Sequence, residues 1–192
     1  MRVDPACSKL TAGKLVVQEY VVAALDGSLA NTFVRLQGSF PPTSVPAQPV
    51  VIDQSGCIYA PRVIGVRVGQ SVQIKNSDPL LHNVEALSGK SNGFNIAQPR
   101  AGLVYEFRPK NEEVMLHLKC GIHSWMNAYL GIVSNPYFAV SNTKGTFQID
   151  RVPPGTYAIE AWHERFGLVK KTISVKAGAV ATIDFAYASP EK

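Results

Sequence analysis

Hydrophobic and polar residues alternate with a period of two along most of this chain. Short runs rich in Val, Ile, Tyr, Phe and Thr are separated by Gly, Asn, Asp and Pro. No stretch keeps a helical period for more than about two turns, so the pattern predicts an all-β protein. The expected strands are 14–24, 31–37, 50–53, 63–68, 71–75, 83–86, 103–107, 114–119, 129–133, 138–140, 146–149, 156–163, 170–175 and 181–187.

A proline-rich segment, residues 40–49, divides this pattern. It holds four prolines in ten residues, which do not fit inside a sheet and indicate a stiff linker between domains. After it, residues 50–135 carry about seven short strands, and this density favours an antiparallel Greek-key sandwich. Residues 1–13 show no strand pattern and are expected to be a loose lead-in.

The candidate chemistry lies at the end of the 114–119 strand. Cys120, His123 and Met126 place a thiolate, an imidazole and a thioether at positions i, i+3 and i+6. These soft or borderline ligands suit copper. A second imidazole is available at His82, and a Cys, two His and a Met form the ligand set of a blue-copper electron-transfer site.

Strand parity supports an inward position for the cysteine. Leu116 and Leu118 have the same parity as Cys120, so all three side chains are expected on the buried face. A tight turn after Cys120 would then return His123 and Met126 to the same point.

The central block resembles the cupredoxin family. The residues that carry the resemblance are 59–61, 68–76, His82-Asn83-Val84 and the run Cys120-x2-His123-x2-Met126, whose spacing is amicyanin-like. The resemblance implies one type 1 copper, with His82, Cys120 and His123 as equatorial ligands and Met126 as the weak axial ligand. It also implies that Asn83 braces the ligand loop from the second shell.

The flanking segments resemble a second family. The runs 145–149 and 152–157, together with 26–36, are similar to the carboxypeptidase regulatory-like, transthyretin-type β-sandwich. This resemblance implies a split domain, 14–40 plus 137–187. The 50–135 copper domain would be inserted into that sandwich or packed against it. In the alternative arrangement, the N-terminal arm pairs with the metal block.

The function implied is the shuttling of single electrons between redox partners, with no enzymatic activity. The partner, a cytochrome or an oxidoreductase, is expected to dock near a solvent-facing His123. Leu80, Leu81, Ile122 and Trp125 would then form an apolar ring around that imidazole, unless they serve only in loop packing. Two other functions stay open: a copper carrier or storage module, and a structural spacer with an accessory copper site.

Composition limits the kinds of partner and the cellular location that we expect. The net charge is +5 over 192 residues, but the basic residues are scattered and do not indicate nucleic-acid binding. No apolar run reaches the ~18 residues of a membrane span. Cys7 and Cys57 are either a disulfide or two unrelated thiols. A disulfide would favour a periplasmic or secreted protein, whose signal peptide is absent from this sequence.

Overall fold

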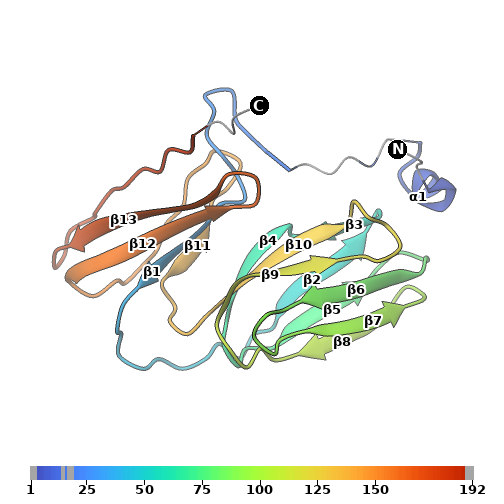
Figure 1. The fold of residues 1–192 in the computed structure, drawn as a ribbon, viewed down its shortest axis with the longest axis horizontal. Helices are drawn as coiled ribbons and strands as arrows, with labels where there is room; N and C mark the ends of the chain where they lie inside the picture. The colour runs from blue at the N-terminus through green and yellow to red at the C-terminus, as the bar shows by residue number, and fades with distance from the viewer. Residues whose placement is uncertain (1–3, 14–15, 17–19, 189–192) are drawn as a thin grey trace. The chain divides into compact units, whose positions relative to one another are not determined.

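The chain folds into two compact units. The computed structural model describes residues 4–13, 16 and 20–188. Unit 1 comprises residues 1–18 and 44–134, and unit 2 comprises residues 19–43 and 135–192. The all-β prediction is confirmed, since among the described residues α1 (Pro5–Leu10) is the only helix (Figure 1). In that same part of the chain, no helix has the length and apolar character needed to cross a membrane.

Unit 1 contains two sheets. The first has the strand order β4-β10-β9-β6-β7, and the second has the order β3-β2-β5-β8. Their bounds are β2 (Val50–Ser55), β3 (Ile58–Ala60), β4 (Val63–Arg67), β5 (Val72–Asn76), β6 (His82–Leu87), β7 (Phe94–Gln98), β8 (Val104–Phe107), β9 (Glu113–Lys119) and β10 (Asn127–Val133). One apolar cluster draws side chains from both sheets, for example Ile74 of β5 and Leu116 of β9. The unit is therefore a β-sandwich.

The pairing in unit 1 differs from the expected antiparallel pattern in two places. β10 pairs with β4 in parallel, and β2 pairs with β5 in parallel. The expectation of an antiparallel block is wrong there, because side-chain alternation reports which face is buried and not the direction of the neighbouring strand. Strands β3 and β7 are additions that the sequence pattern did not predict.

The N-terminal segment is ordered, so the expectation of a loose lead-in is wrong for Asp4–Gly13. Asp4 caps α1 by accepting hydrogen bonds from the N–H groups of Ala6 and Cys7, at 2.7 and 3.3 Å. Cys7 forms a disulfide with Cys57, the pairing that the sequence left open. This bond attaches the helix to the sandwich of unit 1.

Unit 2 contains one sheet with the order β11-β1-β12-β13. The strands are β1 (Phe33–Gln37), β11 (Phe138–Val140), β12 (Gly155–His163) and β13 (Gly167–Val175). β1 lies between β11 and β12 and pairs antiparallel with both. Its partners therefore come from the far end of the chain, beyond all of the strands of unit 1.

Three expected strands of unit 2 are not found as such. Residues 146–149 and 181–187 belong to no strand, and of 14–24 the residues 14–15 and 17–19 lie outside the described part. Only Ala23 forms an isolated bridge, to Leu29. The alternation in 146–149 and 181–187 has another cause: these segments pack apolar side chains, such as Phe147 and Phe185, onto the core of the unit.

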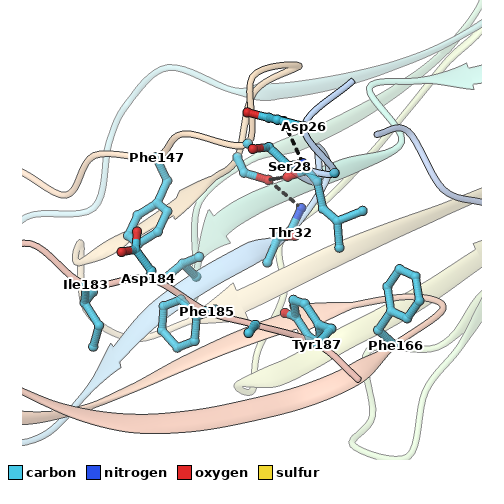
Figure 2. A pocket seen from close by; sticks show the side chains of 15 residues that line it. Asp26, Ser28, Thr32, Phe147, Phe166, Ile183, Asp184, Phe185 and Tyr187 are labelled. Atoms are coloured by element: carbon cyan, nitrogen blue, oxygen red, sulfur yellow. Dashed lines mark hydrogen bonds between the residues drawn. The ribbon is translucent and has the colours of Figure 1, made fainter. Parts of the chain in front are cut away.

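A cavity of about 580 Å³ lies beside these segments. Figure 2 shows Phe147, Phe185 and Tyr187 on one part of its wall and Ser28 and Thr32 on another.

A buried carboxylate holds three strands of unit 2 together. Glu160 on β12 lies between its ladder neighbours Arg35 on β1 and Lys170 on β13. It is only 3% exposed, and its oxygens lie 2.8 Å from Arg35 Nη2 and 2.6 Å from Lys170 Nζ. Burial raises the pKa of Glu160, but the hydrogen bonds from Lys170 and Arg35 lower it more, so the net shift is downward.

We expect Glu160→Gln to lower the free energy of unfolding of unit 2 by about 2 kcal/mol, because a charge-assisted pairing is lost. Because folding lowers the pKa of Glu160, its ionised carboxylate contributes fully to the free energy of unfolding at any pH above the ordinary carboxyl pKa. That contribution is lost as the pH falls through the lowered pKa of the folded state. Denaturant unfolding, monitored by Trp162 fluorescence in a Trp125→Phe background, measures this free energy of unfolding at each pH. Asp184→Asn, at an exposed position of the same unit, is the control.

Candidate metal centre

The loop between β9 and β10 brings the motif residues together. Cys120 follows the last residue of β9, and the loop closes by two backbone hydrogen bonds. Cys120 N–H donates to the carbonyl of Met126 at 3.1 Å, and Met126 N–H donates to the carbonyl of His123 at 2.9 Å. Leu116, Leu118 and Cys120 are all buried, so the predicted inward parity is confirmed.

His82 reaches the neighbourhood of Cys120 and His123 from the start of β6. It is the first residue of β6, and β6 pairs antiparallel with β9. His82 Nδ1 lies 3.1 Å from His123 Nδ1, and the Cys120 sulfur lies 3.9 Å from His123 Nδ1. Ligand atoms of these three side chains all lie within 4.8 Å of one another. The structure thus places the three predicted equatorial residues around one point.

The thiol of Cys120 has an environment that favours its charged form. The N–H groups of Asn83 and His123 each donate to the sulfur at 3.4 Å. Burial raises the pKa of Cys120, but the His82 imidazole and these backbone N–H groups lower it more. The pKa of the thiol is therefore below its ordinary value, as a metal-binding thiolate requires.

The two imidazoles differ in their electrostatics. Burial lowers the pKa of His82, but Cys120 and Asp78 raise it more, so the net shift is upward. For His123, burial and the neighbouring His82 together lower the pKa. When both imidazoles are neutral with the proton on Nε2, the two Nδ1 lone pairs face each other across 3.1 Å. A cation beside them relieves that repulsion, so this donor set fits a soft or borderline metal ion.

Asn83 braces the ligand loop from β6. Its side-chain oxygen accepts from Gly121 N–H at 3.0 Å, and its amide nitrogen donates to Asn95 Oδ1 and to the carbonyl of Ile96. A Cβ at position 121 would lie 3.1 Å from that side-chain oxygen, so the close approach favours glycine there. Met126, at 1% exposure, belongs to the same apolar cluster as Cys120.

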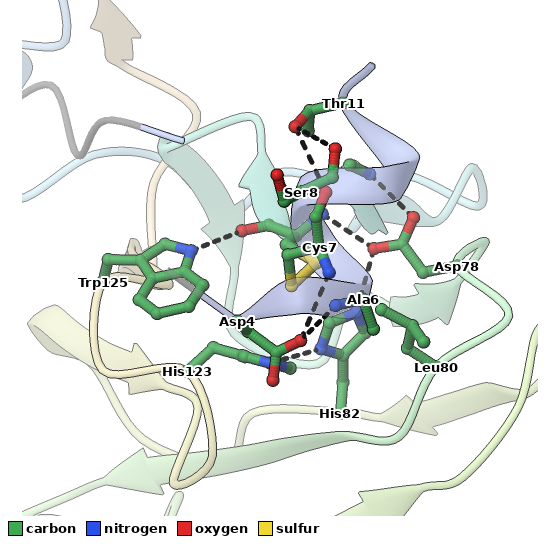
Figure 3. The surroundings of a disulfide bond; sticks show 12 residues. Asp4, Ala6, Cys7, Ser8, Thr11, Asp78, Leu80, His82, His123 and Trp125 are labelled. Atoms are coloured by element: carbon green, nitrogen blue, oxygen red, sulfur yellow. Dashed lines mark hydrogen bonds and ion pairs between the residues drawn. A yellow bond between two sulfur atoms is a disulfide. The ribbon is translucent and has the colours of Figure 1, made fainter. Parts of the chain in front are cut away.

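The expectation that His123 faces solvent is wrong. The residue is 4% exposed, because the N-terminal segment lies against it. Figure 3 shows Asp4 beside His123 and the disulfide close to both histidines, and Asp4 Oδ2 lies 3.5 Å from His123 Nε2. The sequence around His123 gives no sign that the N-terminal segment covers it, because that segment is held in place by a disulfide to the distant Cys57.

The apolar residues expected around His123 divide into two kinds. Leu81 and Ile122 are exposed, at 46% and 48%. Leu80 and Trp125 are partly buried against the core, and the indole N–H of Trp125 donates to the carbonyl of Cys57 at 2.9 Å. Trp125 therefore helps to hold the loop that carries the disulfide.

Sequence reasoning missed Asp78 as a member of the site. Its carboxylate is buried, lies 2.9 Å from His82 Nε2, and accepts from the N–H groups of Gly56 and Cys57. The signal that could have found it is its position, a carboxylate four residues before a candidate ligand histidine.

Comparison with known proteins gives limited likenesses. A family profile described as polysaccharide lyase family 4, domain II matches residues 121–183, the end of unit 1 and strands β11–β13 of unit 2. No curated protein matches significantly.

Three solved structures illustrate the structural likenesses. The copper-containing nitrite reductase (NirK) from Thermus scotoductus SA-01 is 19% identical, with a TM-score of 0.38, over 48% of this chain and only 25% of that chain. A purple cupredoxin from Nitrosopumilus maritimus is 19% identical over 43% of this chain and 98% of that chain, with a TM-score of 0.38. A Cu(I) mutant of amicyanin is 17% identical over 52% and 97%, with a TM-score of 0.39. At these scores, the ligand geometry described above is the stronger observation.

We expect removal of the disulfide to expose His123. In a Cys7→Ser, Cys57→Ser double variant, α1 loses its covalent attachment to unit 1, so the imidazole should react several-fold faster with diethyl pyrocarbonate. Mass spectrometry of the peptide that contains residue 123 measures the rate. His82, which is fully buried, is the internal control. Equal rates at His123 in the double variant and the native protein would show that α1 stays in place without the disulfide.

Proposed function

We propose that this protein is a type 1 copper protein that shuttles single electrons between redox partners. The observation that supports the proposal best is the convergence of the Cys120 sulfur and the Nδ1 atoms of His82 and His123 in a buried site. Copper bound there would supply a Cu(II)/Cu(I) couple whose two oxidation states accept the same ligands.

The residues have separate roles in this proposal. His82, Cys120 and His123 would hold the copper, and Met126 would be a weaker fourth ligand. Asn83 fixes the loop, since its side chain holds Gly121 while its backbone N–H donates to the cysteine sulfur. A ligand loop held in this way moves little when the oxidation state changes, which favours fast electron exchange.

The proposal treats the protein as a carrier of electrons and not as an enzyme. The chain has four histidines, of which two belong to the candidate metal site. Outside the site, His117 hydrogen-bonds to Asn127 and stacks on Tyr129, and His163 is buried in unit 2. Each of them has a structural setting of its own.

The partner would be a cytochrome or an oxidoreductase that docks on the loops carrying the ligands. Leu81 and Ile122 supply exposed apolar surface next to His82 and His123 in sequence, while Leu80 and Trp125 are partly buried against the core. The disulfide is in keeping with a periplasmic or secreted location. Unit 2 serves in this proposal as a transthyretin-type, carboxypeptidase regulatory-like sandwich that spaces the copper domain from its surroundings.

The first test is the visible spectrum after Cu(II) addition. We expect an intense thiolate-to-copper charge-transfer band at one copper per chain, and we expect Cys120→Ser to abolish it, because the thiolate is the source of the transition. His117→Gln, which removes a histidine outside the site, should keep the band. A copper-loaded, oxidised native protein without such a band would contradict the proposal.

A second experiment separates electron transfer from copper storage or delivery. We expect reduced, copper-loaded protein to reduce a cytochrome in stopped-flow mixing much faster than it yields Cu(I) to a chromophoric chelator, because the ligands are buried. If the copper leaves faster than the electron, the carrier or storage function is favoured instead.

A further inference from the structure

The two halves of the disulfide are arranged alike around the two candidate histidine ligands. Cys57 N–H donates to Asp78 Oδ2 at 2.8 Å, and the same oxygen lies 2.9 Å from His82 Nε2. Cys7 N–H donates to Asp4 Oδ1 at 3.3 Å, and the other oxygen of Asp4 lies 3.5 Å from His123 Nε2. Each half-cystine therefore holds one carboxylate, and each carboxylate faces the outer nitrogen of one imidazole (Figure 3).

A carboxylate in this place selects one tautomer of the imidazole. It accepts a hydrogen bond but cannot donate one when ionised, so it holds the ring proton on Nε2. The lone pair is then on Nδ1, and the Nδ1 atoms of His82 and His123 are the ones that face each other beside Cys120. The carboxylates thus prepare both rings to donate to a metal ion at the same point.

We propose that Asp78 and Asp4 are positioning residues for the metal centre, and that the Cys7–Cys57 disulfide holds both carboxylates in place. This inference rests on the proposed copper function but concerns how the chain itself prepares the site. Neither carboxylate belongs to the ligand set, and each acts through one histidine.

The two carboxylates should not contribute equally. Asp78 is 4% exposed and receives three hydrogen bonds, from Gly56, Cys57 and His82. Asp4 has a side chain that is 37% exposed, and its contact with His123 is longer. Asp78 also keeps an anchor that is independent of the disulfide, since its N–H donates to Asn76 Oδ1. Loss of the disulfide should therefore affect His123 more than His82.

The experiment uses asparagine variants of the full chain. Asp78→Asn cannot satisfy Gly56, Cys57 and His82 at once, because one of its two terminal atoms is a donor. Asp4→Asn still caps α1 through its oxygen, but its amide then faces His123 with N–H groups. Asp53→Asn, which alters a unit 1 carboxylate bonded to Ser77, is the matched control.

The first readout needs no copper. Nitrogen-15 NMR of the metal-free protein, at alkaline pH where both imidazoles are neutral, reports the tautomer of each ring. We expect the Nε2–H form for both in the native protein, a shift of His82 toward Nδ1–H in Asp78→Asn, and the same shift of His123 in Asp4→Asn. The Cys7→Ser, Cys57→Ser variant should show a mixture at His123. Unchanged tautomers in the aspartate variants would overturn the proposal.

The second readout is Cu(I) affinity, measured by competition with a chromophoric chelator. We expect a loss of about 10- to 100-fold in Asp78→Asn, a smaller loss in Asp4→Asn, and recovery in Asp78→Glu. Affinities equal to that of Asp53→Asn would overturn the positioning roles. Failure of the native protein to bind copper would instead overturn the proposed function, while the NMR result still decides the tautomers. If Asp78→Asn does not fold, Asp4→Asn decides in both readouts.

Discussion

The buried sulfur of Cys120 accepts two backbone hydrogen bonds, and these bonds link the two ligand loops of unit 1. One donor is the N–H of Asn83 at the start of β6, and the other is the N–H of His123 in the loop after β9. The antiparallel register that places Glu85 opposite Lys119 brings both to Cys120. A slip of β6 against β9 would leave the buried sulfur without one of its donors.

Much of the sandwich of unit 1 was predictable, because period-two alternation reports which side chains are buried. The strand that ends at Cys120 is an example, since Leu116 and Leu118 have the predicted inward parity. Alternation does not report backbone pairing. For that reason it gave strands at 146–149 and 181–187, where apolar side chains pack on the core of unit 2 without a ladder.

The candidate site was predictable only in the part that lies close in sequence or has distinctive chemistry. The spacing of Cys120, His123 and Met126 is local, and His82 follows from the demand for a second imidazole. The cover over His123 is not local: it needs α1, and α1 is held by a disulfide across 50 positions. Asp4 joins the site through that bond, so nothing near it in the sequence indicates a role.

The long segment of unit 1, residues 44–134, has both of its ends near one turn. Val50 pairs with Val72, and Val68 N–H donates to the carbonyl of Val133, so both ends of this segment lie near the turn between β4 and β5. β1 of unit 2 is synthesised before this segment, whereas β11 and β12 are synthesised after it.

During synthesis, both edges of β1 therefore stay unpaired until β11 and β12 have been made. The hydrogen bond from Thr32 to Ser141 spans 109 positions. Once unit 1 has folded, the intervening chain acts as a short connection and the entropy cost of closing that loop falls. Early folding of unit 1 would thus shorten the time for which β1 is exposed as an unpaired strand.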